Sequence, residues 1–254
     1  MARPLTAVAH RGDPYRHREN TVASLRSAVR RGADAVEVDV RLTRDGVPVL
    51  LHDRTLKRLW GQDLPVASLT SADVHELTGG GVPTLAEALE ATAGHRLLLD
   101  LPYDAVGTPA AVRRVLGTVS EGGARERVYW SGAAATLLAV RSADPAAELA
   151  LTWTTAAPPR PGLLAALRPR WLNYRFGLLS GDLVRRAHAD GHLVQAWTAD
   201  TGRTMRRLIA AGVDAVTTNR IDVLTRLRDA GVRASGGAGD AGGTRDAGGA
   251  GEAP

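Results

Sequence analysis

Eight short apolar runs, each followed by a segment with helical periodicity, make up most of this chain. The runs start near residues 7, 35, 97, 128, 148, 171, 193 and 215. Such alternation predicts β-strands that alternate with α-helices, and therefore a largely parallel sheet. Eight strand–helix units in about 230 residues predict a (β/α)8 barrel, the TIM-barrel fold. A doubly wound open sheet is the rival fold, but no glycine-rich phosphate-binding fingerprint follows the first strand to favour it.

A β-hairpin is expected directly after the second strand. Along this strand apolar and polar side chains alternate, so Glu37 and Asp39 share one face. The next apolar run, residues 47–51, follows too closely for a parallel crossover, and we expect it to return antiparallel. With Asp45-Gly46 as a two-residue turn, His52 would lie opposite Asp39. This register would put two carboxylates and an imidazole on one face.

Other segments show where helices begin and where the ordered chain ends. Residues 54–82 have no clear periodicity and are expected to be irregular. Beyond them, Thr84 and Glu87 have the spacing of a capping box at the start of a helix. From about residue 234 the chain contains no apolar residue larger than alanine and cannot build a core. We therefore expect one barrel domain, residues 1–233, and a disordered Gly/Ala-rich tail, residues 234–254.

Composition excludes several classes of protein. A hydrophobic content of 44% with 23% charged residues is typical of a soluble globular protein, and the lack of cysteine excludes disulfides and thiol catalysis. The net charge of +5 comes almost entirely from arginine, because Lys57 is the single lysine. These arginines are spread along helical segments, so we expect solvated faces and no nucleic-acid partner. The N-terminus lacks the apolar core of a signal peptide, and no stretch approaches the ~20 apolar residues of a membrane span. We expect a cytoplasmic protein without stable membrane insertion; its oligomeric state stays open.

Polar residues that could carry chemistry stand near the C-terminal ends of the first three predicted strands. In a barrel, these ends hold the active site. The candidates are His10 and Arg11 on the first strand, Glu37 and Asp39 on the second, His52 on the hairpin and Asp100 on the third. Carboxylates suit a hard cation such as Mg2+ or Ca2+, and two histidines suit a general acid and a general base. An arginine beside them suits a phosphate or carboxylate.

Each candidate also has an ordinary structural reading when it is taken alone. His10-Arg11-Gly12 could be a simple turn, Glu37 and Asp39 an exposed edge face, and Asp100 a cap for the segment after it. Trp197 could belong to the core or to the wall of a pocket. These strand ends are expected to meet at the C-terminal mouth of the barrel, and this convergence favours a shared functional site over the separate structural readings.

Several short motifs follow one another in a fixed order along the chain. They are His10-Arg11-Gly12, Glu19-Asn20-Thr21, Glu37-Val38-Asp39, Thr43 to Gly46, Pro48 to Asp53, Thr55-Leu56 with Arg58, Val82 to Leu85 before Glu87, Ala196 to Thr198, and Gly212 to Thr217. This ordered set resembles the glycerophosphodiester phosphodiesterases, which belong to the barrel superfamily that includes phosphoinositide-specific phospholipases C. The resemblance covers about residues 5–230.

The resemblance implies hydrolysis of a glycerophosphodiester to an alcohol and glycerol 3-phosphate with the help of a divalent cation. It implies His10 and His52 as the acid/base pair, Glu37 and Asp39 as metal ligands, and Arg11 as a phosphate contact. It also implies that a hydroxyl of the substrate's own glycerol attacks phosphorus and gives a cyclic phosphate, which water then opens.

Two positions depart from the family pattern. The family usually carries Glu-x-Lys on the third strand, where this chain has Asp100-Leu101-Pro102. Asp100 is one methylene shorter than glutamate and could still ligate a metal, whereas Pro102 cannot replace an ammonium group. The second departure is Thr217-Thr218-Asn219, which stands where the family tends to have Thr-Asp.

Two alternatives to the enzyme therefore stay open. One is a non-catalytic barrel that binds phosphodiesters or phospholipid headgroups. The other is a phospholipase D-like activity on lysophospholipids, for which exposed apolar residues at the barrel mouth would speak. Leu59-Trp60 is the candidate for such a patch.

Overall fold

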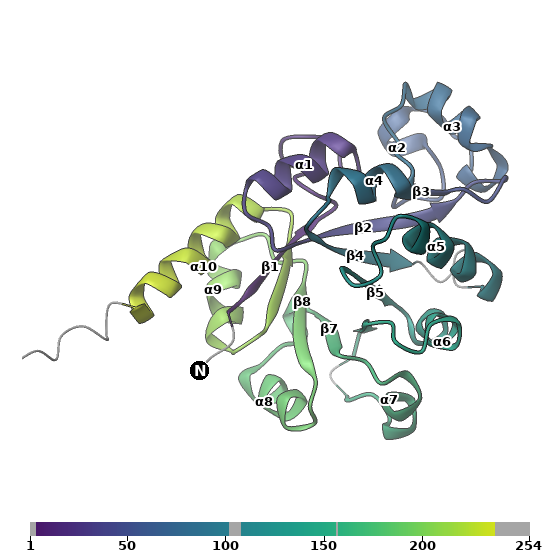
Figure 1. Ribbon diagram of the computed structural model, residues 1–254. Coiled ribbons are helices and arrows are strands. Elements are labelled where there is room, and N and C mark those ends of the chain that lie inside the picture. The colour runs from purple at the N-terminus through teal and green to yellow at the C-terminus, as the bar shows by residue number, and fades with distance from the viewer. Residues whose placement is uncertain (1–3, 102–107, 156, 237–254) are drawn as a thin grey trace, which may run out of the picture.

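The predicted alternation folds into a closed barrel of parallel strands surrounded by helices (Figure 1). The computed structural model describes residues 4–101, 108–155 and 157–236. The barrel strands are β1 (Thr6–His10), β2 (Ala35–Leu42), β4 (Arg96–Leu101), β5 (Val128–Gly132), β6 (Leu149–Trp153), β7 (Trp171–Arg175), β8 (Leu193–Trp197) and β9 (Ala215–Thr218). Strand β1 pairs in parallel with both β2 and β9, which closes the sheet. The TIM-barrel prediction is confirmed.

Helices follow the strands and cover the outside of the barrel (Figure 1). They are α1 (Val22–Arg30), α2 (Lys57–Trp60), α3 (Ser71–Thr78), α4 (Leu85–Ala91), α5 (Pro109–Glu121), α6 (Ala134–Ala143), α7 (Pro161–Leu167), α8 (Gly181–Ala189), α9 (Gly202–Ala210) and α10 (Ile221–Gly236), with 3-10 turns η1 (Val66–Ser68) and η2 (Phe176–Leu178). The predicted capping box at the start of α4 is present, since Thr84 and Glu87 bond each other's backbone N–H groups.

The interior of the barrel is filled by one apolar layer to which every barrel strand contributes. Its members are Val8, Ala35, Leu98, Tyr129, Ala150, Trp171 and Ala215, with Leu193 packed against them. Since side chains on a strand alternate between faces, the residues two positions further along each strand also point inward. The apolar layer therefore forms the base on which the polar C-terminal ends of the strands stand.

The hairpin after β2 is present, but its register differs by one residue from the prediction. Strand β3 (Pro48–Leu50) pairs antiparallel with β2, with Val40 opposite Leu50. The loop holds three residues instead of two, because Thr43 pairs with Val47 and Gly46 takes a left-handed conformation with φ of 80°. Asp39 consequently lies opposite Leu51, and the Leu51 N–H donates to the Asp39 carbonyl at 3.0 Å. The predicted pairing of Asp39 with His52 is wrong.

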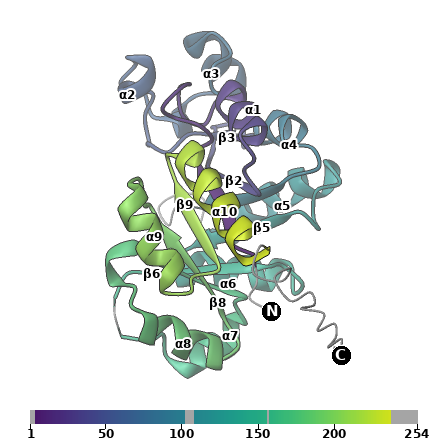
Figure 2. The same cartoon turned by 90° about the vertical axis from the view of Figure 1, so that its left-hand side faces the viewer.

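Residues 54–82 are not irregular, as the sequence suggested, but form a small helical segment with its own core. Helix α3 starts at a capping box formed by Thr70 and Asp73, a signal of the same kind as that of α4. The segment packs around a satellite cluster made of Val49, Leu51, Leu56, Val66, Val74 and Val82. It stands at the end of the barrel toward which β2 and β4 point (Figures 1 and 2).

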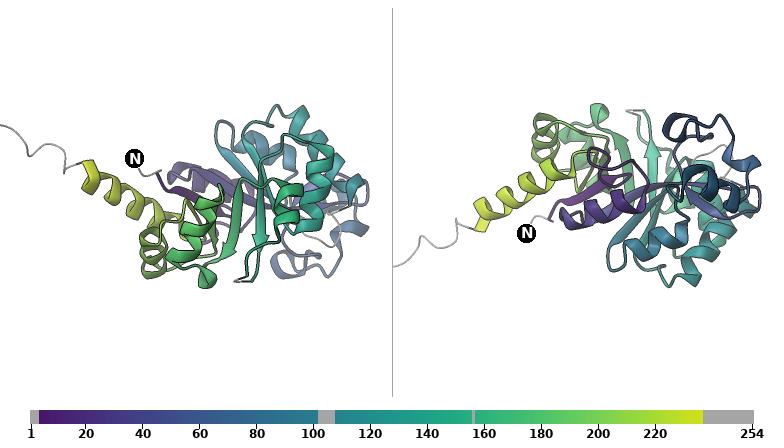
Figure 3. Two further views of the ribbon diagram at one scale, coloured as in Figure 1. Left: turned by 90° about the horizontal axis from the view of Figure 1, so that it is seen from below. Right: turned by 90° about the horizontal axis from the view of Figure 1, so that it is seen from above.

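The last helix lies on the opposite side of the molecule. Helix α10 packs against β1 and extends away from the barrel beside the start of the chain (Figure 3). It runs to Gly236, so the first residues of the predicted tail are helical, whereas 237–254 lie outside the described residues. Within the described part of the chain, no helix combines the length and apolar character needed to cross a bilayer. The domain boundary and the cytoplasmic location stay predictions.

Candidate active site

The side chains predicted to form the site converge on one cavity of about 260 Å³ at the C-terminal end of the barrel. Among the residues that line it are His10, Arg11, Glu37, Asp39, His52, Asp100 and Trp197. These are all seven residues that the sequence singled out. They come from β1 and the turn after it, β2, the turn after β3, β4 and β8, so the barrel brings together positions up to 187 residues apart in the chain (His10 to Trp197).

Three buried or half-buried carboxylates lie together on the wall formed by β2 and β4. Asp39 and Asp100 are directly opposite each other in the parallel register, and Glu37 is two residues before Asp39 on the same face. One oxygen from each of Glu37, Asp39 and Asp100 lies within 4.8 Å of the other two. This spacing allows the three to ligate a single hard cation.

Neighbouring polar groups orient these carboxylates. The Asn20 amide donates to Asp39 Oδ2 at 2.8 Å, and the Ser131 hydroxyl donates to Asp100 Oδ1 at 2.6 Å. The backbone N–H of Arg11 donates to Glu37 Oε2 at 2.9 Å. Each carboxylate thus accepts at least one hydrogen bond that orients it and keeps further lone pairs for a ligand.

The clustered negative charge changes how these acids ionise. Burial raises the pKa of Glu37 well above its ordinary value, and repulsion from Asp39 and Asp100 raises it further. Burial also raises the pKa of Asp100, again with repulsion from Asp39. Arg11 offsets part of this charge. A bound cation would relieve the remaining repulsion, so the donor set fits a divalent metal ion.

Arg11 reaches the site through an unusual backbone. Its φ is 55°, in the left-handed region, and Gly12 follows with φ of 85°. A Cβ on Gly12 would lie 2.4 Å from Ser24 Oγ, which explains why the motif requires glycine there.

The guanidinium of Arg11 lies among acidic groups. Its Nη1 donates to Glu19 Oε1 at 3.0 Å, and its Nε lies 3.0 Å from Asp39 Oδ2. That second approach is an ion pair without hydrogen-bond geometry, so the Nε–H has no hydrogen-bond partner among the described residues. Burial alone would lower the pKa of Arg11, but Asp39, Glu37 and Glu19 raise it above its ordinary value.

His10 is held by a residue that follows the neighbouring strand β9. Its Nδ1 lies 2.8 Å from Asn219 Oδ1, and its Nε2 lies 3.9 Å from Glu37 Oε2. Burial lowers the pKa of His10, and the charge of Arg11 lowers it further. The imidazole is therefore neutral at neutral pH.

His52 enters the cavity from the turn after β3 and not from a strand pair. The Arg41 guanidinium fixes this turn, since its Nε and Nη2 donate to the His52 carbonyl at 3.1 and 2.6 Å. The His52 Nδ1 lies 2.7 Å from Asp53 Oδ1, and its side chain is 47% exposed. The sequence thus placed His52 at the same cavity as the other candidates, although through a wrong register.

Arg58 forms ion pairs with a partner of His52 and with a partner of Arg11, and so links the two sides of the cavity. The Arg58 Nε donates to Asp53 Oδ2 and its Nη2 to Glu19 Oε1, each at 2.5 Å. Since Glu19 also accepts from Arg11, one guanidinium of the helical segment supports both sides of the cavity. The sequence identified Glu19, Asp53 and Arg58 only as motif members and assigned them no role.

The opposite wall of the cavity is neutral and polar. It comprises Ser131, Thr152, Asn173, Gln195 and Thr217, with the indole of Trp197 beside them. Asn173 and Gln195 are not among the residues predicted from the sequence. Each stands at the centre of its barrel strand between apolar neighbours, Leu172 and Tyr174 or Val194 and Ala196, a signal that could have identified both.

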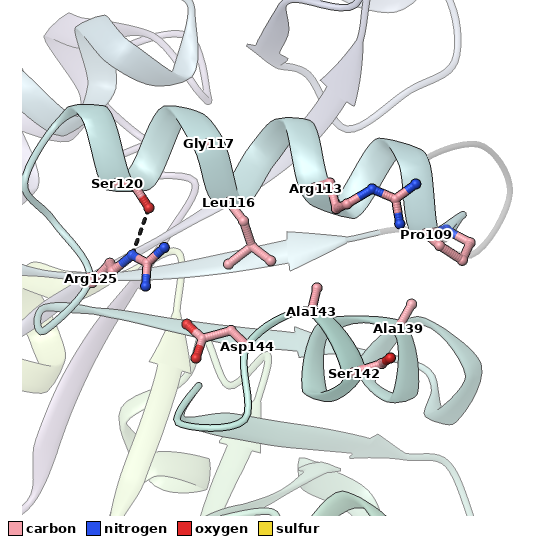
Figure 4. A pocket seen from close by; sticks show the side chains of 10 residues that line it. All are labelled: Pro109, Arg113, Leu116, Gly117, Ser120, Arg125, Ala139, Ser142, Ala143 and Asp144. Atoms are coloured by element: carbon pink, nitrogen blue, oxygen red, sulfur yellow. Dashed lines mark hydrogen bonds between the residues drawn. The ribbon is translucent and has the colours of Figure 1, made fainter.

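A second hollow, of about 490 Å³, lies on the outside of the barrel between α5 and α6 (Figure 4). It includes Arg113, Arg125 and Asp144, and the Arg125 Nε donates to Ser120 Oγ at 2.6 Å. Although it is larger than the barrel cavity, it collects none of the strand-end residues. We therefore place the candidate active site in the barrel.

Comparison with known proteins agrees with this geometry. The sequence profile of the glycerophosphoryl diester phosphodiesterase family matches residues 10–223. The chain belongs to this family. The match spans the candidate site from His10 on β1 to Asn219 after β9, and it confirms the family and the enzyme class expected from the motifs.

Individual members of the phosphodiesterase family resemble the chain over most of its length. "Probable glycerophosphodiester phosphodiesterase 2" of Mycobacterium tuberculosis is 31% identical over 241 residues, which cover 86% of this chain and 88% of that protein. The glycerophosphodiester phosphodiesterase of Caldanaerobacter subterraneus is 27% identical, and the match covers 87% of this chain and 96% of that protein. An Oleispira antarctica phosphodiesterase, solved in complex with the product sn-glycerol-3-phosphate, superposes with a TM-score of 0.78 at 25% identity and covers 89% and 97% of the two chains.

The family lysine position falls on Pro102, which lies outside the described residues. Lys57, the single lysine of the chain, pairs with Asp63 at 2.7 Å and does not line the cavity. Arg11 is the cationic residue among those that line it. The positive charge near a bound phosphate would therefore come from Arg11.

Proposed function

We propose that this chain hydrolyses glycerophosphodiesters to an alcohol and glycerol 3-phosphate, with a divalent cation and two histidines. The observation that carries the proposal is the convergence of three carboxylates, Arg11 and two imidazoles on one cavity at the C-terminal end of the barrel. The Oleispira antarctica relative, solved with sn-glycerol-3-phosphate, supports the product. The cavity volume of about 260 Å³ is near the lower end of the roughly 300–1,000 Å³ of small-molecule pockets, which suits a headgroup-sized substrate.

Glu37, Asp39 and Asp100 would hold the cation, and oxygen ligands suit Mg2+ or Ca2+. When bound, it would polarise a phosphoryl oxygen and neutralise charge that develops in the transition state. The chain's own contribution is to hold the three carboxylates in place through Asn20, Ser131 and the Arg11 backbone. The Nε–H of Arg11, which lacks a hydrogen-bond partner among the described residues, is the donor we assign to the phosphate.

His10 is the general base in this proposal. A neutral imidazole can take the proton of an attacking hydroxyl, and the lowered pKa of His10 keeps it neutral at neutral pH. Its Nε2 accepts that proton while a hydroxyl of the substrate's glycerol forms the new bond to phosphorus. The product of this step is a cyclic phosphate.

His52 is the general acid. Its Nδ1 hydrogen-bonds the Asp53 carboxylate, which orients the ring, and its Nε2 is the nitrogen that we assign to carry the proton for the leaving group. As the bond from phosphorus to the leaving alcohol breaks, this proton passes to the alcohol oxygen. Water then opens the cyclic phosphate with the two histidines in exchanged roles, which returns both to their starting states.

The structure gives less support to a lipid-directed activity. Leu59 and Trp60, the candidate lipid-facing patch, pack against the satellite cluster of the helical segment and are only partly exposed. A small-molecule phosphodiester is therefore the substrate class we favour.

The test is release of glycerol 3-phosphate from a panel of glycerophosphodiesters by the purified chain with Mg2+, Ca2+ or a chelator. We expect cation-dependent release that is lost in His10→Ala. Binding of the phosphodiesters without release from any of them would indicate the non-catalytic barrel instead.

A further inference from the structure

The His10 imidazole is the first member of a hydrogen-bond chain that the proposed mechanism does not use. Its Nδ1 meets Asn219 Oδ1 at 2.8 Å, and Asn219 Nδ2 donates to Asp200 Oδ2 at 2.8 Å. Asn219 follows β9, and Asp200 lies in the loop between β8 and α9. The hydrogen-bond chain therefore joins residues at the C-terminal ends of three strands, β1, β9 and β8.

Asp200 is itself fixed by several donors. The backbone N–H of Asn219 donates to its Oδ1 at 2.8 Å, and the Thr218 hydroxyl donates to the same oxygen at 3.2 Å. Both oxygens of the Asp200 carboxylate thus face Asn219, one toward its backbone and one toward its side chain. The carboxylate clamps this asparagine in a single orientation.

This clamp determines which imidazole nitrogen of His10 carries the proton. An ionised carboxylate only accepts hydrogen bonds, so the NH2 group of Asn219 must point to Asp200 and its carbonyl must point to His10. A carbonyl also only accepts, so the Nδ1 of His10 must be the donor. The lone pair then sits on Nε2, on the side of Glu37 and the cavity.

We propose that Asn219 and Asp200 are positioning residues that hold His10 as the Nδ1–H tautomer, with its basic Nε2 directed at the reacting atoms. The inference deepens the proposed function and rests on His10 acting there. Neither residue lines the cavity, so both act through His10. In the hydrogen-bond chain the neutral amide of Asn219 lies next to His10, and the carboxylate of Asp200 lies behind that amide. The imidazole is therefore oriented without a negatively charged group in contact with its Nδ1.

The experiment compares four variants of the full chain: Asp200→Asn, Asn219→Ala, the double exchange Asp200→Asn with Asn219→Asp, and Asp222→Asn. In Asp200→Asn, the amide at position 200 can donate as well as accept, and Asn219 loses its fixed orientation. In the double exchange, a carboxylate accepts from His10 directly and an amide holds it from behind. Asp222→Asn is the matched control, since Asp222 pairs with Arg220 next to Asn219 but lies outside the chain to His10.

For turnover, we expect Asp200→Asn and Asn219→Ala to lose roughly 10- to 100-fold in kcat with KM changed only a few-fold, the size typical of partners that orient a functional histidine. The double exchange should recover most of this loss, and Asp222→Asn should stay within about twofold of the parent. If Asp200→Asn and Asn219→Ala lower Tm but keep kcat within about twofold, the pair is merely structural and the proposal is overturned.

A second readout does not depend on activity. The imidazole 15N chemical shifts of His10, assigned by comparison with His10→Gln, report the tautomer directly. We expect a pure Nδ1–H tautomer in the parent and in Asp222→Asn, and a mixture in Asp200→Asn. An Nε2–H tautomer in the parent would refute the proposal. Since these spectra need no substrate, they separate a failure of this inference from a failure of the proposed function.

Discussion

Asp39 and Asp100 face each other across the pairing of β2 with β4, two carboxylates brought together by parallel register alone. Such a pair is unfavourable without a counter-ion, because like charges in a buried place oppose each other's ionisation. We therefore expect Asp100→Asn to have two opposite effects. The metal-free protein should become more stable by about 1 kcal/mol, or roughly 2–4 °C in Tm. The cation concentration needed for half-maximal activity should rise by about tenfold or more.

Differential scanning calorimetry in chelator and a cation titration of activity check both effects. An Asp100→Asn variant with unchanged cation dependence would remove Asp100 from the ligand set.

Metal removal should affect stability in a pH-dependent way. The pKa values of Glu37 and Asp100 are raised in the folded protein, so ionising them destabilises the fold. This penalty is absent below the pKa values of the unfolded chain and grows as pH rises through the folded values. Protons also compete with the cation at low pH. The rise in Tm on adding saturating Mg2+ or Ca2+ should therefore be larger at about pH 8 than at about pH 5. Equal increments at both pH values would argue that the cation binds elsewhere.

Gly12 should tolerate no side chain. In Gly12→Ala, the new Cβ would meet Ser24 Oγ at 2.4 Å and its carbonyl carbon at 2.6 Å, in addition to a left-handed φ of 85°. Gly94→Ala is a matched control, with φ of 78° and open space around the new Cβ. We expect Gly94→Ala to lose about 1–2 kcal/mol of unfolding free energy, from backbone conformation alone. Gly12→Ala should lose about 1–3 kcal/mol more from the clash.

Urea unfolding measures both losses, and turnover should fall only in Gly12→Ala, because His10 and Arg11 precede it directly. Similar losses in the two variants would show that the β1–α1 loop adapts to the extra methyl group.

Arg58 should matter for turnover although it lies outside the cavity. It joins Asp53, the partner of His52, to Glu19, the partner of Arg11. We expect Arg58→Ala to lower kcat by about tenfold and Arg58→Lys to recover part of the lost kcat. A lysine keeps the positive charge but lacks the planar guanidinium that donates to both carboxylates. Arg44→Ala is the control, because Arg44 lies in the loop between β2 and β3, is 61% exposed and pairs with Asp73 of α3 at 3.8 Å. An Arg58→Ala variant as active as Arg44→Ala would contradict this role.

The barrel and the convergence of the candidate residues on one cavity could be predicted because the information is local. Polar residues at every second position of short apolar strands, such as Glu37 and Asp39, show which face points inward, and their place near the strand end shows the mouth. Asp100 follows the same rule on β4.

The hairpin register could not be predicted from the turn sequence, because a distant contact holds the loop. Asp45 accepts from the Thr43 hydroxyl at 2.5 Å and from the Ser71 backbone N–H at 3.0 Å, which ties the loop to α3. The Asp45-Gly46 pair by itself is typical of a two-residue turn, and no local pattern indicates this tether to α3.

The partners of His10 lay beyond sequence reasoning for a related reason. Asn219 is 209 positions away, and it meets His10 only because β9 closes the barrel against β1. No local pattern marks Asp200 as its clamp.

The most direct test of the central claim is the turnover of a glycerophosphodiester by His52→Ala in the presence of saturating cation. The same measurement on His95→Ala serves as control, because His95 lies in an exposed turn and hydrogen-bonds the Ala93 carbonyl. We predict a loss of roughly 100- to 10,000-fold for His52→Ala, the usual contribution of general acid–base catalysis, and parent activity for His95→Ala. Turnover of His52→Ala within a few-fold of the parent would contradict the assigned role of His52 and the proposed two-histidine mechanism.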